Sequence, residues 1–143
     1  MLLVTIGAAA ATESSVSHDV NIAIASVRML EVQQNWETRS STRDSGGNTV
    51  IHLVSRYGVT CNVPDSSIEA VLVSPLPGGV TVRLRMTTTV GTGTGWHNLA
   101  TNGGTQLVQN PRGAEFNTVE VVVSVPADVD PGSVQLDLSF GIR

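Results

Sequence analysis

The side chains that could carry acid–base or metal chemistry are scattered along this chain. The histidines His18, His52 and His97 show none of the short paired spacings that zinc sites use. Serine is abundant, but the G-x-S-x-G pattern that places a nucleophilic serine on a sharp turn is absent. His52 stands between Ile51 and Leu53 in an alternating stretch, so we expect it on a solvated face. The sequence therefore predicts a protein that is not an enzyme, with no catalytic residue, cofactor or metal.

Two loops resemble ligand-binding motifs in part. Gly91–Gly95 follows an apolar stretch, but it lacks the Gly-Lys-Ser/Thr of a P-loop and does not match G-x-G-x-x-G. Asp128 and Asp130 begin like a calcium loop, but Ser139 occupies the position of the bidentate glutamate. We predict that both loops are simple turns between strands.

Arginine and tryptophan offer two further candidates. Arg83 and Arg85 share the outward face of an alternating stretch, where they could bind an acidic partner or a surface polysaccharide. The favoured interpretation is a solvated face or a cross-strand ion pair with Glu69 or Glu120. The two tryptophans, Trp36 and Trp96, could stack on sugars, although packing against the core or a loop is favoured.

Composition limits the class of protein. The chain has 143 residues, a net charge of −4 and only 14% charged residues, and its eight basic residues are all arginine. The basic residues form no cluster along the sequence, which argues against a nucleic-acid partner. No apolar run reaches the roughly 18 residues that a membrane-spanning helix requires. The one cysteine, Cys61, lies in phase with Tyr57 and Val59, which predicts a buried apolar role.

The clearest strand pattern closes the chain. Over Ser133–Ile142 apolar and polar residues alternate, as in a strand with one buried face. The stretch Val119–Val125 alternates in the same way, and Asp130-Pro131-Gly132 between the two reads as a turn. We therefore predict that these two strands form a hairpin.

Further strand patterns lie at residues 20–32, with a bend near Ser26–Arg28, and at 49–63, 68–73 and 80–90. Weak strands at 96–100 and 106–109 flank Asn102-Gly103-Gly104, which favours another hairpin. Residues 33–48 are polar and predict a long surface loop with an edge strand around Trp36. About eight strands indicate an all-β fold, an immunoglobulin-like or jelly-roll sandwich over residues 20–143, preceded by a tail at 1–19.

The tail is apolar at alternate positions and could itself form a strand. It ends in Ala9-Ala10-Ala11 before Thr12, which resembles the end of a secretory signal peptide, and a polar linker follows to Asp19. An extended apolar tail can add itself as a strand to the sandwich of a neighbouring copy. Burying four or five aliphatic side chains in this way contributes on the order of 10 kcal/mol before the costs of association.

One resemblance follows from this arrangement. The apolar N-terminus, the long first strand, the sandwich and the turn Val125–Ser133 before a final alternating strand resemble secreted prokaryotic filament subunits. The similar class is the pilins that polymerise by donor-strand exchange, including bundling-pilus and biofilm-fibre proteins. The single Cys61 differs from chaperone–usher pilins, which usually carry a disulfide, and favours the chaperone-independent kinds. The resemblance implies an extracellular, cell-surface homopolymer.

The resemblance also implies site residues. The donor strand would present Leu2, Val4, Ile6 and Ala8 or, after cleavage before Thr12, Val16, Val20, Ile22 and Ile24. The acceptor groove would be flanked by the final strand, through Val134, Leu136, Leu138, Phe140 and Ile142. Two other functions stay open at this point: a virion coat or decoration subunit, and a monomeric carbohydrate-binding or adhesive module.

Overall fold

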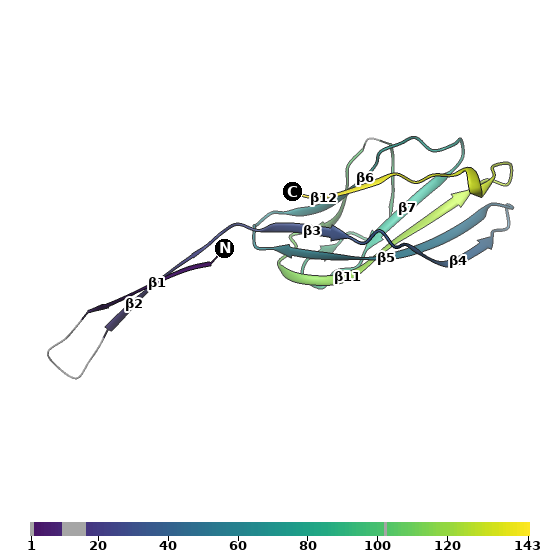
Figure 1. Cartoon of the computed structure of the whole chain (residues 1–143). Coiled ribbons are helices and arrows are strands. Elements are labelled where there is room, and N and C mark those ends of the chain that lie inside the picture. The colour runs from purple at the N-terminus through teal and green to yellow at the C-terminus, as the bar shows by residue number, and fades with distance from the viewer. Residues whose placement is uncertain (1, 10–16, 102) are drawn as a thin grey trace.

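The computed structural model describes residues 2–9, 17–101 and 103–143. Figure 1 shows two parts, a β-sandwich and an N-terminal hairpin that points away from it along its long axis. The hairpin consists of β1 (Leu2–Ala9) and β2 (Ser17–Ile24). In the described part of the chain, no helix is long and apolar enough to cross a membrane.

The first sheet of the sandwich has the order β3-β5-β11-β7-β9, with β4 also paired to β5. Its two long strands, β5 and β11, have 13 residues each and pair antiparallel along their whole length. At about 3.3 Å per residue they span roughly 43 Å, the long dimension of the sandwich. The strands are β3 (Arg28–Val32), β4 (Glu37–Arg43), β5 (Thr49–Cys61), β7 (Thr81–Met86), β9 (His97–Asn98) and β11 (Gly113–Val125).

The second sheet is smaller and has the order β12-β6-β10-β8. Its strands are β6 (Ser67–Leu72), β8 (Thr92–Gly93), β10 (Thr105–Gln109) and β12 (Leu138–Ile142). All pairs between its strands are antiparallel. The predicted all-β sandwich is therefore confirmed.

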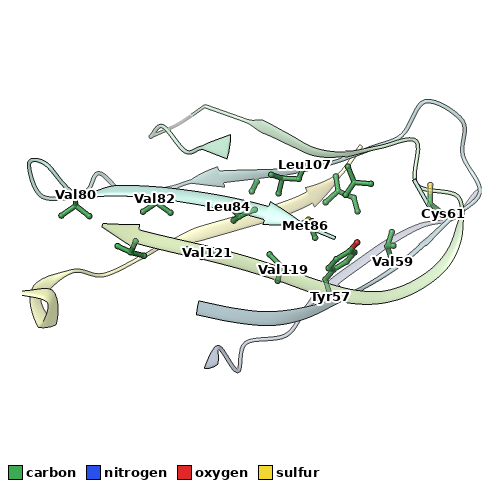
Figure 2. Close-up of a cluster of buried hydrophobic side chains, with 14 of the residues drawn as sticks. Tyr57, Val59, Cys61, Val80, Val82, Leu84, Met86, Leu107, Val119 and Val121 are labelled. Carbon is green, nitrogen blue, oxygen red and sulfur yellow. The ribbon is translucent and has the colours of Figure 1, made fainter. Parts of the chain in front are cut away.

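The core fills the space between the two sheets (Figure 2). Alternate residues of β7 and β11 enter it, so Leu84 and Val119 are fully buried while their neighbours face outward. Tyr57 is also fully buried, and its hydroxyl donates to the carbonyl of Thr87 at 2.5 Å. Burial and the nearby charge of Glu115 raise the pKa of Tyr57 to about 12, so the phenol stays protonated as a donor.

Cys61 belongs to the same core, where it is 1% exposed. Its thiol lies 3.6 Å from the carbonyl oxygen of Val63. The predicted role of this residue as a small buried apolar group is confirmed.

The predicted closing hairpin is wrong, because the two strands belong to different sheets. β11 pairs with β5 and β7, whereas β12 pairs with β6. The turn residues instead form a short 3-10 helix, Pro131–Ser133, in which the carboxylate of Asp130 accepts from the Gly132 N–H at 3.0 Å. Residues 126–137 use this helix to cross from one sheet to the other, and the predicted strand shortens to Leu138–Ile142.

The second predicted hairpin, around Asn102–Gly104, is also wrong. β9 pairs with β7 in the first sheet, and β10 pairs with β6 and β8 in the second. The polar loop predicted at 33–48 contains a seven-residue strand, β4, which pairs with β5. All seven residues of β4 are exposed, so no apolar periodicity marks it in the sequence.

The predicted strands at 49–63 and 20–32 have different bounds in the structure. β5 runs through Gly58 without a break, and the ring of Phe116 covers the space that a side chain would take there. The predicted long strand at 20–32 divides into β2 and β3, with residues 25–27 between them, at the expected bend. The residues that precede this bend pair with β1 instead of joining the sandwich.

Candidate functional site

A groove of about 460 Å³ opens along one edge of the sandwich. It lies between the first sheet and the segment that leads into β12, and its wall includes the connection between β3 and β4. Its lining is apolar except for two polar side chains, Gln34 and Asp137. The apolar lining residues are Val32, Trp36, Ile51, Leu53, Val121, Val123, Val125, Pro131, Val134, Leu136, Leu138 and Phe140.

The floor of the groove is continuous with the core. Val121 and Val123 of β11 are 1% and 3% exposed, and they reach the groove from the inner face of the first sheet. The rim is only half-buried and includes Trp36 on one side and Leu136 on the other. An occupant of this groove would therefore extend the core by covering the half-buried apolar side chains of the rim, because the floor is already buried.

One wall of the groove ends in an unpaired strand edge. The main chains of Arg143 and Ser67 exchange two hydrogen bonds of 2.7 and 2.9 Å, and the Val73 N–H donates to the Asp137 carbonyl at 2.8 Å. In an antiparallel ladder such bonded pairs alternate with pairs whose N–H and C=O groups point away. Those of Leu138, Phe140 and Ile142 point away from β6, to a side where no strand pairs with β12 in the described part of the chain.

The residues predicted for the acceptor side lie together at this groove. Four of them line it and Ile142 packs partly buried against the core just beyond, and all five are half-buried and alternate with exposed neighbours. The lining residues among them are Val134, Leu136, Leu138 and Phe140. Their geometry suits the predicted role, which stays a prediction.

The residues predicted for the donor strand lie in the hairpin. Leu2, Val4, Ile6 and Ala8 are in β1, whereas Val20, Ile22 and Ile24 are in β2; Val16 lies outside the described residues.

The strand register relates these two predicted donor sets. Positions 2, 4 and 6 lie directly opposite 24, 22 and 20, and opposite positions share one face of a sheet. The two sets, treated as alternatives from the sequence, are therefore cross-strand neighbours. The side chains of Ile22 and Ile24 are 58% and 71% exposed.

Trp36, Ile51 and Leu53 are part of the groove but were not predicted as site residues. The alternation of Ile51 and Leu53 marks an inward face, yet it gives no sign that part of this face is uncovered. Trp36 packs against the core as favoured from the sequence, and it also forms the rim. Only the three-dimensional structure shows that the connection after β3 and the segment before β12 come together around this part of the face.

A second polar centre lies on the outer face of the first sheet. Glu120 accepts from Arg85 Nε at 2.9 Å and from Arg39 Nη1 at 3.4 Å, and His52 Nε2 lies 3.2 Å from the same carboxylate. The predicted ion pair between Arg85 and Glu120 is confirmed, while Glu69 pairs with Arg143 at 3.4 Å instead. His52 takes part in this outer-face cluster, as its position between two apolar neighbours predicts.

The charge of Glu120 is stabilised although its side chain is 7% exposed. Burial alone would raise the pKa of Glu120, but the hydrogen bond and positive charge of Arg85, with a smaller effect of His52, hold it below the usual value. The carboxylate is therefore ionised at neutral pH and fixes the surrounding guanidinium groups. The centre is an ion network on the outer face of the first sheet.

The remaining residues that the sequence analysis singled out, Trp96 and the glycine loop among them, lie in ordinary structural positions. Trp96 lies against the guanidinium groups of Arg83 and Arg85, which are 5.6 and 4.6 Å from its ring centroid. The glycine loop contributes the short strand β8, which pairs with β10. Within the described ranges, no three His, Cys, Asp or Glu residues gather as a metal site would require.

Comparison with protein-family models, with curated proteins and with solved structures finds no match for this chain. The features of the molecule that bear on function are therefore the groove, the unpaired edge of β12 and the hairpin.

Proposed function

We propose that this chain is the structural subunit of an extracellular filament, in which the β2 strand of one copy occupies the groove of the next. The observation that carries the proposal is the apolar groove beside the unpaired edge of β12. A strand in this position would pair with the free N–H and C=O groups of β12 and place alternate side chains on the groove floor. A second copy of this chain offers such a strand.

The dimensions of donor and acceptor agree. β2 has eight residues, about 26 Å at 3.3 Å per residue. The rim from Val134 to Phe140 has seven residues and is at most about 23 Å long by the same measure. Val20, Ile22 and Ile24 occupy alternate positions of β2, so one face of the strand would meet the groove along its length.

The hairpin favours capture by a second copy over folding back. β1 and β2 contact each other extensively and share no extensive contact with any strand of the sandwich. Figure 1 shows β1 and β2 directed away from the sandwich. An arm on one side of a subunit and a groove on another make a heterologous contact, which continues into an open chain unless it closes into a ring.

The free energy of burial also favours insertion of β2 into a groove. An isolated two-stranded hairpin is marginally stable in water, and exposed isoleucines on it gain nothing from burial. Transfer of Ile22 and Ile24 into a groove would contribute about 1.5–3 kcal/mol each before the costs of association. Removal of residues 1–11, as the alanine-rich stretch before Thr12 suggests for a secreted chain, would free β2 from β1.

Electron microscopy of the native, unheated protein tests the proposal. We expect long uniform fibres from the chain that begins at Thr12, and none from the same chain with Ile22→Asp and Ile24→Asp. The control for an added negative charge is Asn98→Asp on the short strand β9 at the opposite edge of the first sheet, which should leave fibres intact, whereas Ile22→Asp or Ile24→Asp alone should not. Fibres from the double variant would contradict the proposal, closed shells would favour a virion subunit, and monomers would favour a soluble binding module.

A further inference from the structure

The outer face of the first sheet carries a cluster that strand exchange does not use. We define the arginine face as Arg39 of β4, His52 of β5, Arg83 and Arg85 of β7, Glu120 of β11 and the adjoining Trp96. Arg83 and Arg85 alternate with the buried Val82 and Leu84, so they point away from the core. The groove opens between the sheets, so the two surfaces are separate.

The arginine face has an excess of positive charge. Its three guanidinium groups lie near one buried carboxylate, Glu120, and the exposed Glu37 shares the same face opposite Val54, which leaves one positive charge uncompensated before His52 is counted. The whole chain, by contrast, has a net charge of −4 and only eight arginines. Among the described residues, the ion pairs of this face involve Arg39 and Arg85 but not Arg83.

The positive groups are both ordered and accessible. Glu120 binds Arg85 through Nε, and the Arg85 guanidinium then lies 4.6 Å from the Trp96 ring centroid. Arg83 lies 5.6 Å from the same ring. The side chains of Arg39 and Arg85 are still 59% and 39% exposed. Side chains held in this way lose less freedom when they bind an anion, so more of the contact energy appears as affinity.

The spacing of the charges indicates an extended ligand. Arg39 and Arg83 lie on β4 and β7, which are separated by β5 and β11. Three strand spacings of about 4.8 Å separate the backbones of β4 and β7 by roughly 14 Å, so a ligand that contacts side chains from both strands would lie across four strands of the sheet. Arginine suits carboxylates because its N–H groups form a planar fork, and Trp96 adds an apolar surface next to it.

We infer that the arginine face binds an acidic polysaccharide whose carboxylates pair with Arg39, Arg83 and Arg85. The inference does not depend on filament assembly, because it concerns the outer face of the sandwich of a single copy. Nucleic acid is the less favoured polyanion, since three arginines contact few phosphates and the chain is acidic overall.

The test measures the emission of Trp96 in a Trp36→Phe variant, so that one tryptophan reports. Polygalacturonate is titrated at low salt, with neutral dextran of similar length as the matched polymer. We expect saturable binding of polygalacturonate alone, weakened as salt is raised. Arg39→Gln and Arg83→Gln should each reduce the affinity roughly tenfold, as expected for the loss of one charge-assisted hydrogen bond.

Arg112→Gln is the control for net charge, because Arg112 is exposed in the connection between β10 and β11 and belongs to no ion pair of the described residues. Its affinity should equal that of the parent chain. Arg83→Gln keeps every ion pair of Glu120, so its melting temperature should be unchanged. Equal binding of dextran, an equal loss in Arg112→Gln, or no binding would overturn the inference, as would tighter binding of a single-stranded oligonucleotide.

Discussion

The strands β11 and β2 have the same sequence pattern and opposite surroundings. In β11 the alternate valines from Val119 to Val125 are at most 3% exposed and belong to the core, although three of them also line the groove. In β2, Ile22 and Ile24 are 58% and 71% exposed. Alternation therefore specifies a strand and which of its faces is apolar, but not which surface will cover that face.

The groove and the hairpin extend this comparison to the two sides of a contact. Along most of the sandwich the inner face of the first sheet is closed by the second, but at the edge beside β12 the half-buried residues of the rim leave it open. In one copy the isoleucines of β2 are thus exposed, and the groove beside β12 holds no strand of the described residues. The following predictions test whether these two regions differ as their burial indicates.

The largest effect is expected from a charge in the covered strand. Val121→Asp should unfold the sandwich, because it places a carboxylate without a partner where the parent side chain is 1% exposed. Circular dichroism and thermal melting would show the loss of a cooperative transition. In Ile24→Asp the same charge enters the exposed strand, and the melting temperature should stay close to that of the parent chain. Equal destabilisation by both variants would contradict the comparison.

The next largest effect concerns the outer ion network. Glu120→Ala should lower the free energy of unfolding by about 3 kcal/mol, since it removes the buried carboxylate that binds Arg85. Chemical denaturation would measure the change. Glu37→Ala, in the exposed strand β4, is the matched control and should change stability by less than about 0.5 kcal/mol.

A smaller difference separates the core from the groove rim. Leu84→Ala, which empties a fully buried position, should cost about 2–5 kcal/mol. Leu136→Ala, at the half-buried rim, should cost roughly 1 kcal/mol in the isolated subunit, because less apolar area is lost. In filaments the Leu136→Ala effect should increase if a strand covers the rim. An identical effect in subunit and filament would show that the rim stays open.

The smallest effect is the response to acid. Hydrogen bonds from Asn117, Thr88 and Thr89 outweigh burial and lower the pKa of Glu115, as the arginine contact does for Glu120. Groups with a lowered pKa in the folded state contribute stability above their unfolded pKa and lose it as pH falls through the folded pKa. Stability should therefore decrease below about pH 4.5.

Denaturation at pH 5.5 and pH 3.5 would measure this response to acid. In Glu115→Gln the difference in unfolding free energy between the two pH values should be smaller than in the parent chain. An undiminished difference would mean that other groups cause the acid sensitivity.

The strands of the core could be predicted because each has one covered face. The valines of β11 and the Val82–Met86 stretch of β7 alternate without interruption, and their burial follows that pattern. The strand β4 was predicted only as an edge strand around Trp36, directly before its start at Glu37, because its seven exposed residues leave no periodic signal that gives its bounds and it is held by backbone pairing with β5. Sheet membership was also missed at the final strand, since a turn sequence such as Asp130-Pro131-Gly132 fixes local geometry without choosing a pairing partner.

The candidate site was only partly accessible from sequence. Alternation identified the half-buried face of the final strand, from Val134 to Ile142, which follows the groove edge. The opposite rim at Trp36 belongs to the connection between β3 and β4. The position of such an irregular segment cannot be predicted from hydrophobic periodicity. The arginine face was also predicted only in part. The ion pair of Arg85 with Glu120 was expected from the outward position of Arg85, but the contact of Arg39 with Glu120 depends on the pairing of β4 with β5.

The antiparallel pairing of β3 with β5 has a mechanical consequence for a linear assembly. The hairpin leads directly into β3, and Figure 1 shows it aligned with the long axis of the sandwich. A pull on the arm would thus run along β3, perpendicular to the hydrogen bonds that join it to β5. Under that load the five residue pairs from Arg28 to Val32 share the force in shear and do not open one at a time. A subunit loaded this way would resist tension with very few bonds.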